Sequence, residues 1–600
     1  MQIDNKQPRM EYPRPDFERA SYLNLNGTWD FLFDDENVGV KEEWFLGKEF
    51  TSSIVVPYTY LCELSGINNQ DIHEIMWYRR TVPVKELELK DRLILNFGAV
   101  DYYSDIWVNG NHVCYHEGGS IPFSIDITDA VKTDEITIVV RAEDSTYDLE
   151  LPRGKQFWKQ QSEGIFYTRT AGIWQTVWLE SVAESYLDKV WITPDLDEKF
   201  VEMDFSLHGT REKSVEVIIS LKGRELIKDC ISIQNNRTKR KFWLDDGITL
   251  NWNHQETWAW SPENPVLFDV TLKVFDQENK TIMDEVKTYF AFRKISVVNG
   301  KVMLNNRPYY MKMILDQGYW RKSLLTAPTD EDFVRDINAC KAMGFNGARK
   351  HQKVEDPRYL YWADKLGFLV WGESDSAYVY SRKYAEKAVK IWMDIVKRDY
   401  NHPCIVAWVP LNESWGVQEI MHKQDQQMHS LCLYYLVKSL DQTRLVISND
   451  GWNHTKSDLL TIHDYESSYE VLTKRYECIE RILNSTPSQR TLIAQGFTYE
   501  NQPVIVSEMG GISFSKHDAI GWGYSNAQND EDFIERYYKV VTPMLESSNI
   551  QGFVYTQLCD VEQEINGLLT YDREYKVKPE IIRSINEGKG YCMMEGTGGN

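Results

Sequence analysis

The sequence predicts a multidomain protein in which a jelly-roll β-sandwich and an immunoglobulin-like β-sandwich precede a C-terminal (β/α)₈ barrel. The chain has 600 residues, which is too many for one hydrophobic core and corresponds to about three or four domains. Short strand-like segments fill its first half, whereas strand-like and helical segments alternate in the second half. The expected domains are residues 1–182, 183–294 and 295–600.

The first domain is expected to be an antiparallel sandwich. Its strand-like segments are short and rich in β-branched and aromatic residues, which fit a pleated, half-buried surface. Turn signals at 109–111 and 118–119 separate them, and helical periodicity is scarce. The segments are residues 77–84, 92–100, 104–113, 135–143 and 170–180.

A second block of strand-like segments follows, with the spacing of a small sandwich. It ends around residues 288–300, so its length of about 110 residues suits an immunoglobulin-like domain. Its clearest segments are residues 189–196, 200–209, 215–223 and 266–276.

From residue 301 the chain alternates eight apolar strand-like runs with helical stretches, which is typical of a parallel sheet that closes into a barrel. The helix between the fifth and sixth runs is missing or very short. An open doubly wound sheet is the alternative, but the first turn, residues 316–328, lacks its G-x-G-x-x-G signature. The runs are residues 309–316, 346–352, 367–374, 405–414, 444–450, 459–465, 503–511 and 551–560.

Composition restricts the partners of the chain. With 67 basic and 90 acidic residues, the net charge is −23, which disfavours nucleic acid and anionic membranes. The sequence shows neither an apolar run long enough to span a bilayer nor a signal peptide, so we expect a cytoplasmic protein. Nine scattered cysteines without a C-x-x-C pair predict free thiols rather than a zinc or redox site.

Polar residues end the barrel strands, and two of these ends stand out. The fourth run ends in Asn412 and Glu413, and the seventh ends in Glu508. Such groups belong in a buried strand only if they are paired or perform chemistry. In a barrel, the carboxyl ends of all strands meet at the rim that carries active sites. The other polar strand ends are Asp316, Lys350, His351, Glu373, Asp375, Asn449, Asp450, His463, Asp464, Tyr465, Gln557 and Asp560.

Two carboxylates on opposite strands are the minimum equipment for glycoside hydrolysis, because one donates a proton to the leaving oxygen while the other attacks the sugar. Strands four and seven lie nearly opposite in an eight-strand barrel, so Glu413 and Glu508 are expected to face one bond. We expect repulsion between the two charges to raise the pKa of one of them, which would make that residue the acid.

Four motifs carry a resemblance to a known family: LNGTWDF at 25–31, DIWVNGNHV at 105–113, NES at 412–414 and SEMGG at 507–511. With these motifs the chain resembles glycoside hydrolase family 2, which contains β-galactosidases, β-glucuronidases and β-mannosidases. The resemblance implies a sugar-binding-like first sandwich and a retaining mechanism through a covalent glycosyl-enzyme. It also implies roles for five residues: Glu413 as acid/base, Glu508 as nucleophile, Asn412 on the sugar 2-hydroxyl, Tyr465 beside the nucleophile and His351 on the nonreducing sugar.

The chain departs from the family pattern at three places. Met509 and a glycine pair, Gly510-Gly511, follow the nucleophile, and Tyr555 stands where a tryptophan is common. The Asn-x-Lys motif that grips a glucuronide carboxylate reads Asn566-Gly567-Leu568, without the lysine. The expected activity is therefore exo-hydrolysis of the β-galactosidase type. A β-glucuronidase or an arabinosidase is the alternative within the family.

Further substrate-binding candidates have structural alternatives. Asp316 and Asp450 could instead cap helices or hold loops, and His351 could be ion-paired among Arg349, Lys350 and Lys353. The remaining candidates are Trp415, Trp452 and Gln557, of which the tryptophans could instead be core residues.

Two other functional classes remain as rivals. An inactive carbohydrate-binding protein would have no need for the Glu413 and Glu508 pair. A metal-dependent barrel hydrolase would need His-rich strand ends, whereas strand one offers Asp316 and Gln317. We expect no organic cofactor and no particular metal, although a cation is compatible with the sequence. The expected partner is a glycoside, and a homo-oligomer is compatible with the family.

Overall fold

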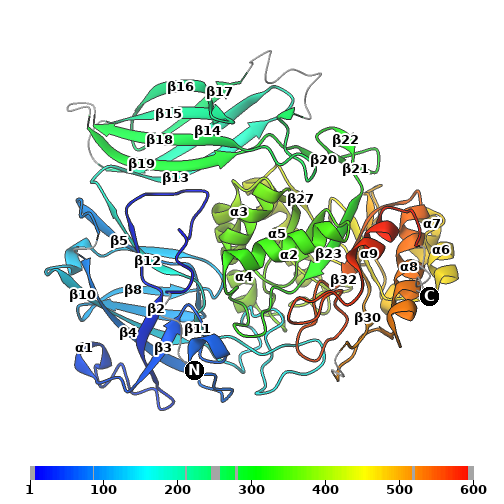
Figure 1. The fold of residues 1–600 in the computed structure, drawn as a ribbon, viewed down its shortest axis with the longest axis horizontal. Coiled ribbons are helices and arrows are strands. Elements are labelled where there is room, and N and C mark those ends of the chain that lie inside the picture. Colours follow the sequence, from blue (N-terminus) through cyan, green and yellow to red (C-terminus); the bar gives the residue numbers. More distant parts are fainter. Residues whose placement is uncertain are drawn as a thin grey trace, which may run out of the picture.

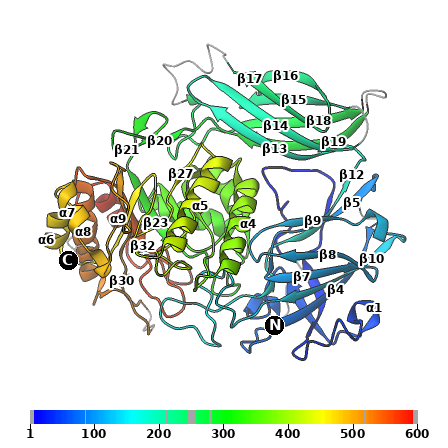
Figure 2. The same cartoon turned by 180° about the vertical axis from the view of Figure 1, so that it is seen from behind.

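The computed structural model describes residues 7–84, 87–209, 213–244, 257–276, 281–516 and 520–591. It consists of two β-sandwiches and a barrel, as the sequence predicts. In Figures 1 and 2 the first sandwich and the barrel lie side by side, and the second sandwich lies across both. The described part of the chain begins at the first sandwich and ends in the barrel domain.

The first sandwich packs a four-stranded sheet, β1-β12-β5-β9, against a six-stranded sheet, β3-β2-β4-β10-β7-β8. All the strand pairs in these two sheets are antiparallel. Their bounds, with those of α1 and the small pair β6-β11, are β1 Tyr22–Asn24, β2 Gly27–Phe33, α1 Trp44–Gly47, β3 Ser52–Val56, β4 Ile75–Pro83, β5 Arg92–Phe97, β6 Val100–Asp101, β7 Tyr103–Val108, β8 Asn111–Glu117, β9 Phe123–Asp126, β10 Glu135–Glu143, β11 Gly172–Ile173 and β12 Val177–Val182.

The second sandwich pairs a three-stranded sheet, β13-β14-β17, with a four-stranded sheet, β16-β15-β18-β19. Its core follows from the two-residue period of the strands: in β15, Val215, Val217, Ile219 and Leu221 are buried and alternate with half-buried residues. The bounds are β13 Tyr186–Asp195, β14 Phe200–His208, β15 Lys213–Leu221, β16 Arg224–Ile233, β17 Arg237–Trp243, β18 Phe268–Asp276 and β19 Ile282–Phe290.

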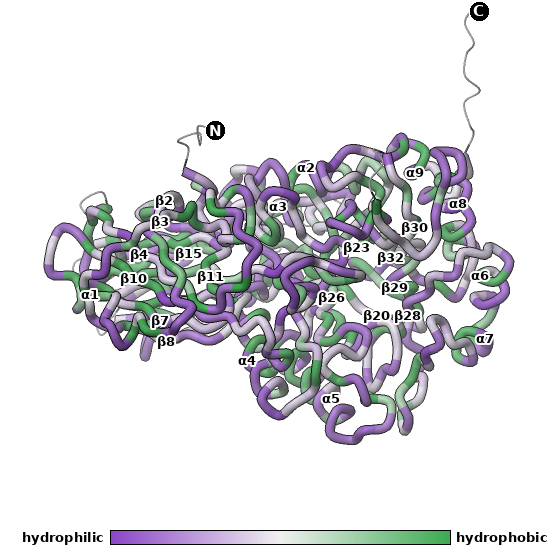
Figure 3. Tube along the Cα trace, turned by 90° about the horizontal axis from the view of Figure 1, so that it is seen from below, coloured by the Kyte–Doolittle hydropathy of each residue, from purple (hydrophilic) through white to green (hydrophobic). Residues whose placement is uncertain are grey.

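The barrel contains eight strands in the order β27-β26-β25-β24-β23-β32-β29-β28, all of whose printed pairs are parallel. Figure 3 shows β23, β26, β28, β29 and β32 arranged around the barrel axis. Each of the eight runs predicted from the sequence overlaps a barrel strand. Their bounds are β23 Met311–Asp316, β24 Gly347–Lys350, β25 Leu369–Glu373, β26 Ile405–Val409, β27 Leu445–Val446, β28 Leu460–Asp464, β29 Val504–Gly510 and β32 Ile550–Thr556.

Amphipathic helices connect the strands and cover the barrel. Several begin at a polar cap, as at Thr329, Ser381 and Asn529, whose side chains accept backbone N–H groups of the first turn. No helix within the described ranges combines the length and apolar composition needed to cross a membrane. The bounds are α2 Asp330–Ala342, α3 Pro357–Leu366, α4 Arg382–Asp399, α5 Gln424–Leu440, α6 Tyr469–Arg475, α7 Ile479–Asn484, α8 Asp530–Glu546 and α9 Pro579–Asn586.

Short strands precede the barrel and extend its rim. The hairpin strands β20 Ile295–Val298, β21 Lys301–Leu304 and β22 Arg307–Pro308 form a three-stranded sheet at the start of the barrel domain. After the seventh barrel strand, β30 Ile512–Ser513 pairs with β31 Ser525–Asn526.

The barrel is interrupted between its fifth and sixth strands, where the sequence predicts a missing or very short helix. β27 has only two residues, and residues 447–459, all of them described, contain no helix. β27 and β28 are the two ends of the strand order, with no ladder between them among the described residues. The segment from β27 to β28 therefore folds inward and brings Asp450 against the strand-four end, where Asn412 and Asp450 form an isolated bridge.

A long loop of the first sandwich, residues 144–171, reaches the carboxyl ends of the barrel strands (Figure 1, cyan). Its backbone accepts hydrogen bonds from barrel side chains: Trp522 Nε1 lies 3.0 Å from the Gly164 carbonyl and Gln563 Nε2 lies 2.8 Å from the Phe166 carbonyl. On the other side, Arg153 N donates to the Ser376 carbonyl. The 144–171 loop thus covers one side of the rim.

Candidate active site

An unusual backbone conformation holds Glu413 at the rim. It follows β26 with a φ of 51°, and Ser414 follows with a φ of 62°. Non-glycine residues rarely adopt this left-handed conformation, which persists where surrounding contacts fix it and clusters at functional sites. Here the Glu413 N–H donates to the Asp450 carbonyl at 2.9 Å, and Ser414 N–H donates to Asn449 Oδ1 at 2.9 Å. These contacts aim the Glu413 carboxylate into the barrel mouth.

Glu508 lies inside β29 and is 5% exposed. Its Oε1 accepts a hydrogen bond from Arg349 at 2.8 Å, and its Oε2 accepts one from the Tyr465 hydroxyl at 2.6 Å. One carboxylate oxygen of Glu413 lies within 4.8 Å of one from Glu508. This separation is close to the roughly 5–5.5 Å of retaining glycosidases and shorter than the gap that inverting enzymes need for a water molecule.

Arg349, on β24, holds the acidic groups of the site together. Its side chain is fully buried and contacts three carboxylates: Glu373, Asp450 at 2.7 Å and Glu508 at 2.8 Å. Nη2 also donates to Asn412 Oδ1 at 2.5 Å. The desolvated cation is therefore surrounded by counter-charges, and its planar fork fixes the positions of several groups at once.

His463, at the end of β28, bridges the two sides of the interrupted barrel. Its Nδ1 lies 2.7 Å from Glu413 Oε1 and 3.5 Å from Glu508 Oε2, and its Nε2 lies 2.9 Å from Asp450 Oδ2. Burial alone would lower the pKa of this imidazole, but Glu508, Asp450 and Glu413 outweigh burial and raise it to about 10. At neutral pH the ring is therefore an imidazolium that donates from both nitrogens.

The expected rise in an active-site carboxyl pKa is wrong for Glu413. Burial acts to raise the pKa of Glu413, but the hydrogen bond and charge of His463, with smaller contributions from Lys155 and Arg349, lower it below its ordinary value. The cation that lies between the two carboxylates outweighs the repulsion between them. His463, rather than Glu508, therefore has the larger effect on the pKa of Glu413.

Tyr465 also follows β28, beside the nucleophile candidate. Its ring stacks on Tyr524 with centroids 3.4 Å apart. The glycine pair after Glu508 makes room for these rings, because a Cβ on Gly511 would lie 2.4 Å from Tyr524 and one on Gly510 would lie 2.3 Å from Tyr555. Two departures from the family pattern, Gly510-Gly511 and Tyr555, thus fit each other sterically.

Asn412 and His351 complete the cluster. Asn412 Nδ2 is buried and has no hydrogen-bond partner among the described residues. His351 Nδ1 lies 3.1 Å from Arg349 Nη2 and 4.0 Å from Glu508 Oε1. Burial, assisted by Arg349 and Lys155, lowers the pKa of His351 well below its usual range. His351 is therefore neutral and accepts from Arg349.

Three further predicted residues lie around the cluster. Asp450 is buried between Arg349 and His463, and although burial acts to raise its pKa, these two cations lower it. Trp452 packs against the His463 ring with centroids 5.5 Å apart. Trp415 stacks near Phe166 of the 144–171 loop, with centroids 5.5 Å apart. These two tryptophans belong to the walls of the site.

The structure does not bring Asp316 to the carboxylate pair. Its Oδ2 lies 2.5 Å from Lys350 Nζ, in a buried ion cluster that also contains Glu355. Gln557 is fully buried and hydrogen-bonds to Gln317 and Asn566. Asp560 accepts from Lys576 at 2.6 Å. All three of these strand ends hold loops together.

Besides Arg349, two residues close to the cluster were not predicted from the sequence, Lys155 and Glu564. Lys155 lies in the 144–171 loop, is 9% exposed and places its ammonium 5.3 Å from the Trp415 ring centroid. Glu564 follows β32 and accepts from Tyr167 at 2.6 Å and Asn566 at 3.0 Å. Burial raises the pKa of Glu564, Lys155 counteracts this rise and Glu508 adds to it. Both residues therefore border the site, Glu564 after strand eight and Lys155 beside Trp415.

Neither residue carried a usable signal in the sequence. Lys155 belongs to another domain, and Glu564 lies in a loop rather than at a strand end. Arg349 and His463, in contrast, did carry a signal in the sequence. Both occupy apolar strand-like runs, where a charged or titratable side chain needs partners.

The three groups Glu413, His463 and Glu508 bring potential metal-ligand atoms within 4.8 Å of one another. His463 is already hydrogen-bonded to Glu413, and Glu508 already accepts hydrogen bonds from Arg349 and Tyr465. A divalent cation there would meet the Arg349 guanidinium and the His463 imidazolium. The donor set therefore fits a shared proton better than a metal ion.

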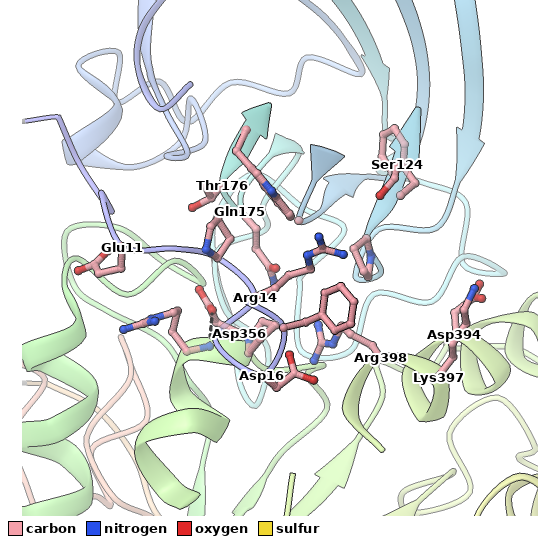
Figure 4. Close-up of a pocket in the computed structure, with 18 of the residues that line it drawn as sticks. Glu11, Arg14, Asp16, Ser124, Gln175, Thr176, Asp356, Asp394, Lys397 and Arg398 are labelled. Atoms are coloured by element: carbon pink, nitrogen blue, oxygen red, sulfur yellow. Dashed lines mark hydrogen bonds between the residues drawn. The ribbon is translucent and has the colours of Figure 1, made fainter. Parts of the chain in front are cut away.

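A separate cavity of about 350 Å³ lies where both sandwiches meet the barrel (Figure 4). Its lining mixes acidic and basic side chains, including Arg14, Asp16, Asp356 and Arg398. Glu413 and Glu508 do not line it. The cavity thus belongs to the domain junction and not to the candidate active site.

Comparisons with known proteins cover nearly the whole chain. Three family models match: the sugar binding domain of glycosyl hydrolases family 2 over residues 22–181, glycosyl hydrolases family 2 over 185–293 and the family 2 TIM barrel domain over 295–588. A β-glucuronidase of Rattus norvegicus is 22% identical over 96% of this chain and 92% of its own length. A β-galactosidase of Photobacterium profundum is 24% identical over 74% of this chain and 44% of its own length.

The chain spans about half or less of the length of several curated relatives, 51%, 44% and 36% in three of them. Among solved structures, a β-glucuronidase of Bifidobacterium dentium in complex with coumarin-3-O-glucuronide has a TM-score of 0.78 at 18% identity. That alignment covers 95% of this chain and 98% of the other. This structural likeness supports the fold, and the three family models show that the chain belongs to glycosyl hydrolases family 2.

Proposed function

We propose that the protein is a retaining exo-glycosidase that removes a terminal neutral hexose, with a β-galactosidase type of activity. The observation that carries this proposal is the approach of the Glu413 and Glu508 carboxylates to within 4.8 Å at one rim of the barrel. A double displacement requires this arrangement, because one carboxylate attacks the anomeric carbon while the other serves the leaving oxygen.

In the first half of the proposed reaction, Glu508 Oε1 or Oε2 forms a bond to the anomeric carbon while the glycosidic bond breaks. Arg349 and the Tyr465 hydroxyl, which contact the two oxygens, orient the carboxylate. Glu413 passes a proton to the departing oxygen. In the second half, Glu413 takes a proton from water, which attacks the glycosyl-enzyme and releases Glu508.

Asn412 is proposed to hold the sugar 2-hydroxyl through its unpartnered amide Nδ2. Hydrogen bonds to this hydroxyl strengthen as positive charge develops on the ring, so they stabilise the transition state more than the substrate. The 144–171 loop, clamped to the rim through Gly164 and Phe166, limits one end of the site. A closed end suits removal of a terminal sugar.

Two observations favour a neutral sugar over a uronide. Leu568 stands where the family's glucuronide-binding motif has lysine, and it is buried in the core. In addition, the carboxylate of Glu564 borders the site, where it can accept hydrogen bonds from sugar hydroxyls but would repel a uronate.

A uronidase is the second candidate, because Lys155 supplies a cation at the border of the site. Several relatives and structural neighbours carry such names, among them a β-galacturonidase of Eisenbergiella tayi. An ammonium can pair with a uronate carboxylate, or it can donate to hydroxyls.

A panel of nitrophenyl glycosides tests the proposal. We expect release of nitrophenol from the β-galactoside, with much slower or no release from the β-glucuronide, β-galacturonide and α-arabinoside. Preference for a uronide would support the second candidate. Absence of hydrolysis across the panel, with retained sugar binding, would instead indicate a binding protein.

Two single variants distinguish the roles of the bordering charges. Glu564→Gln should lower kcat/KM on the preferred hexoside by about 10- to 100-fold, because the sugar loses a charged hydrogen-bond acceptor. Lys155→Met should have the smaller effect on this substrate. The same two variants are assayed on the uronide. If Lys155→Met abolishes its hydrolysis and Glu564→Gln leaves it intact, the neutral-sugar assignment is contradicted.

A further inference from the structure

We propose that His463 is the proton store of the acid/base: between turnovers the proton rests on His463 Nδ1, and Glu413 relays it to the leaving oxygen. His463 is thus a positioning and proton-supplying residue that acts through Glu413 rather than on the sugar. This inference rests on the proposed glycosidase function and adds to it a residue that the two-carboxylate scheme does not contain.

The geometry of the ring carries the inference. Nδ1 lies 2.7 Å from Glu413 Oε1, a distance typical of a charge-assisted hydrogen bond. Nε2 lies 2.9 Å from Asp450 Oδ2, so Asp450 holds the second ring N–H and fixes the ring plane. This chain of carboxylate, imidazole and carboxylate has the form in which one acid orients a histidine that exchanges a proton at its other nitrogen.

The surroundings keep the ring charged. Its side chain is fully buried, and the arginine on its Nε2 side is already paired with Asp450 and Glu508. Two neighbouring histidines, His351 and His454, have lowered pKa values, with burial as the main cause. The titratable and charged groups that face His463 are Glu413, Asp450, Glu508, Arg349, His351 and His454.

The protons taken up and released balance over one catalytic cycle. In the first half reaction the Nδ1–H proton moves to Glu413 and on to the leaving oxygen, which leaves His463 as a neutral imidazole with its remaining proton toward Asp450. In the second half reaction the attacking water gives a proton to Glu413, which returns it to Nδ1. One proton leaves with the alcohol and one arrives with water, so no other donor is needed.

His463→Asn is the main test, because asparagine retains an N–H donor near Nδ1 but cannot store an exchangeable proton. With a phenyl glycoside, we expect a loss in kcat/KM of about tenfold at pH 6 that grows to on the order of 10²- to 10³-fold at pH 9. The alkaline limb of the pH profile should move toward acid by at least about one pH unit. With a dinitrophenyl glycoside, whose leaving group needs no proton, the loss should stay below about tenfold at both pH values.

A matched control is His429→Asn, which removes another buried histidine, on α5. His429 packs against the Tyr384 ring with centroids 5.8 Å apart and is not among the groups that face His463. Any effect of this variant on packing should be the same at every pH and for every leaving group. If His463→Asn behaves in this way as well, His463 is only structural and the inference is overturned.

Nitrogen-15 NMR of the wild-type protein tests the inference without any variant. Inactivation with a fluoroglycoside, which blocks Glu508, should perturb one histidine that shows two protonated ring nitrogens at pH 8. A neutral ring at this position would overturn the proton store even if glycosidase activity is present. Absence of hydrolysis of any aryl glycoside by the wild type would instead contradict the proposed function itself, so the two failures are distinguishable.

Discussion

Replacing Glu508 with glutamine lowers kcat on an aryl glycoside by on the order of 10⁴- to 10⁶-fold, the range seen when an enzyme loses its nucleophile. Glutamine has nearly the same shape and keeps one oxygen, which can still accept from Arg349, while its amide group takes the place of the oxygen beside the Tyr465 hydroxyl. The loss therefore reflects the missing negative charge at the anomeric carbon and not a change in packing. Steady-state assays with the preferred nitrophenyl glycoside measure it.

Glu419→Gln is the matched control, because this glutamate lies exposed in the loop after the fourth strand and pairs with Lys423 on the surface. It should retain full activity. If Glu508→Gln kept more than about a tenth of the wild-type rate, Glu508 would not be the nucleophile.

Replacing Arg349 with methionine lowers the free energy of unfolding by about 3–5 kcal/mol at neutral pH, the cost of leaving buried charges without their partner. Methionine fills similar space but removes the cation that contacts Glu373, Asp450 and Glu508. In the variant, the pKa values of the acids left behind should rise above their values in the unfolded chain. The loss of stability should then be smaller at pH 5, where these acids take up protons, than at pH 8.

Urea denaturation of the wild type and the variant at both pH values measures this difference. Arg349→Lys is the matched control, because lysine retains one charge but not the planar fork, and it should fall between the two. An equal loss of stability at pH 5 and pH 8 would show that Arg349 contributes packing rather than charge.

Much of the fold could be predicted because its elements carry local signals. Each barrel strand overlaps an apolar run, and the capped starts of α2 and α8 follow from Thr329 and Asn529. The pairing of Glu413 with Glu508 was also predictable, since the topology of a parallel barrel brings strand ends to one rim. The lack of a helix in residues 447–459, all of them described, was predictable as well, whereas the break between β27 and β28 was not.

The electrostatics of the site could not be predicted in the same way. Repulsion between Glu413 and Glu508 depends on what lies between them, and His463 reaches that position only because the chain between β27 and β28 folds inward. Lys155 approaches the site from a different domain, through a loop whose path no local pattern specifies. Asp316 was predicted to bind substrate from its place at a strand end, but its carboxylate faces a buried lysine instead of the pocket.

Covalent labelling tests the central claim most directly. The protein is incubated with a 2-deoxy-2-fluoro-β-galactosyl fluoride, whose glycosyl-enzyme is hydrolysed slowly, and the labelled peptide is identified by mass spectrometry. We predict one fluorosugar attached to Glu508, with none on Glu413. A label on another residue, or turnover of aryl glycosides with inversion at the anomeric carbon, would contradict the account.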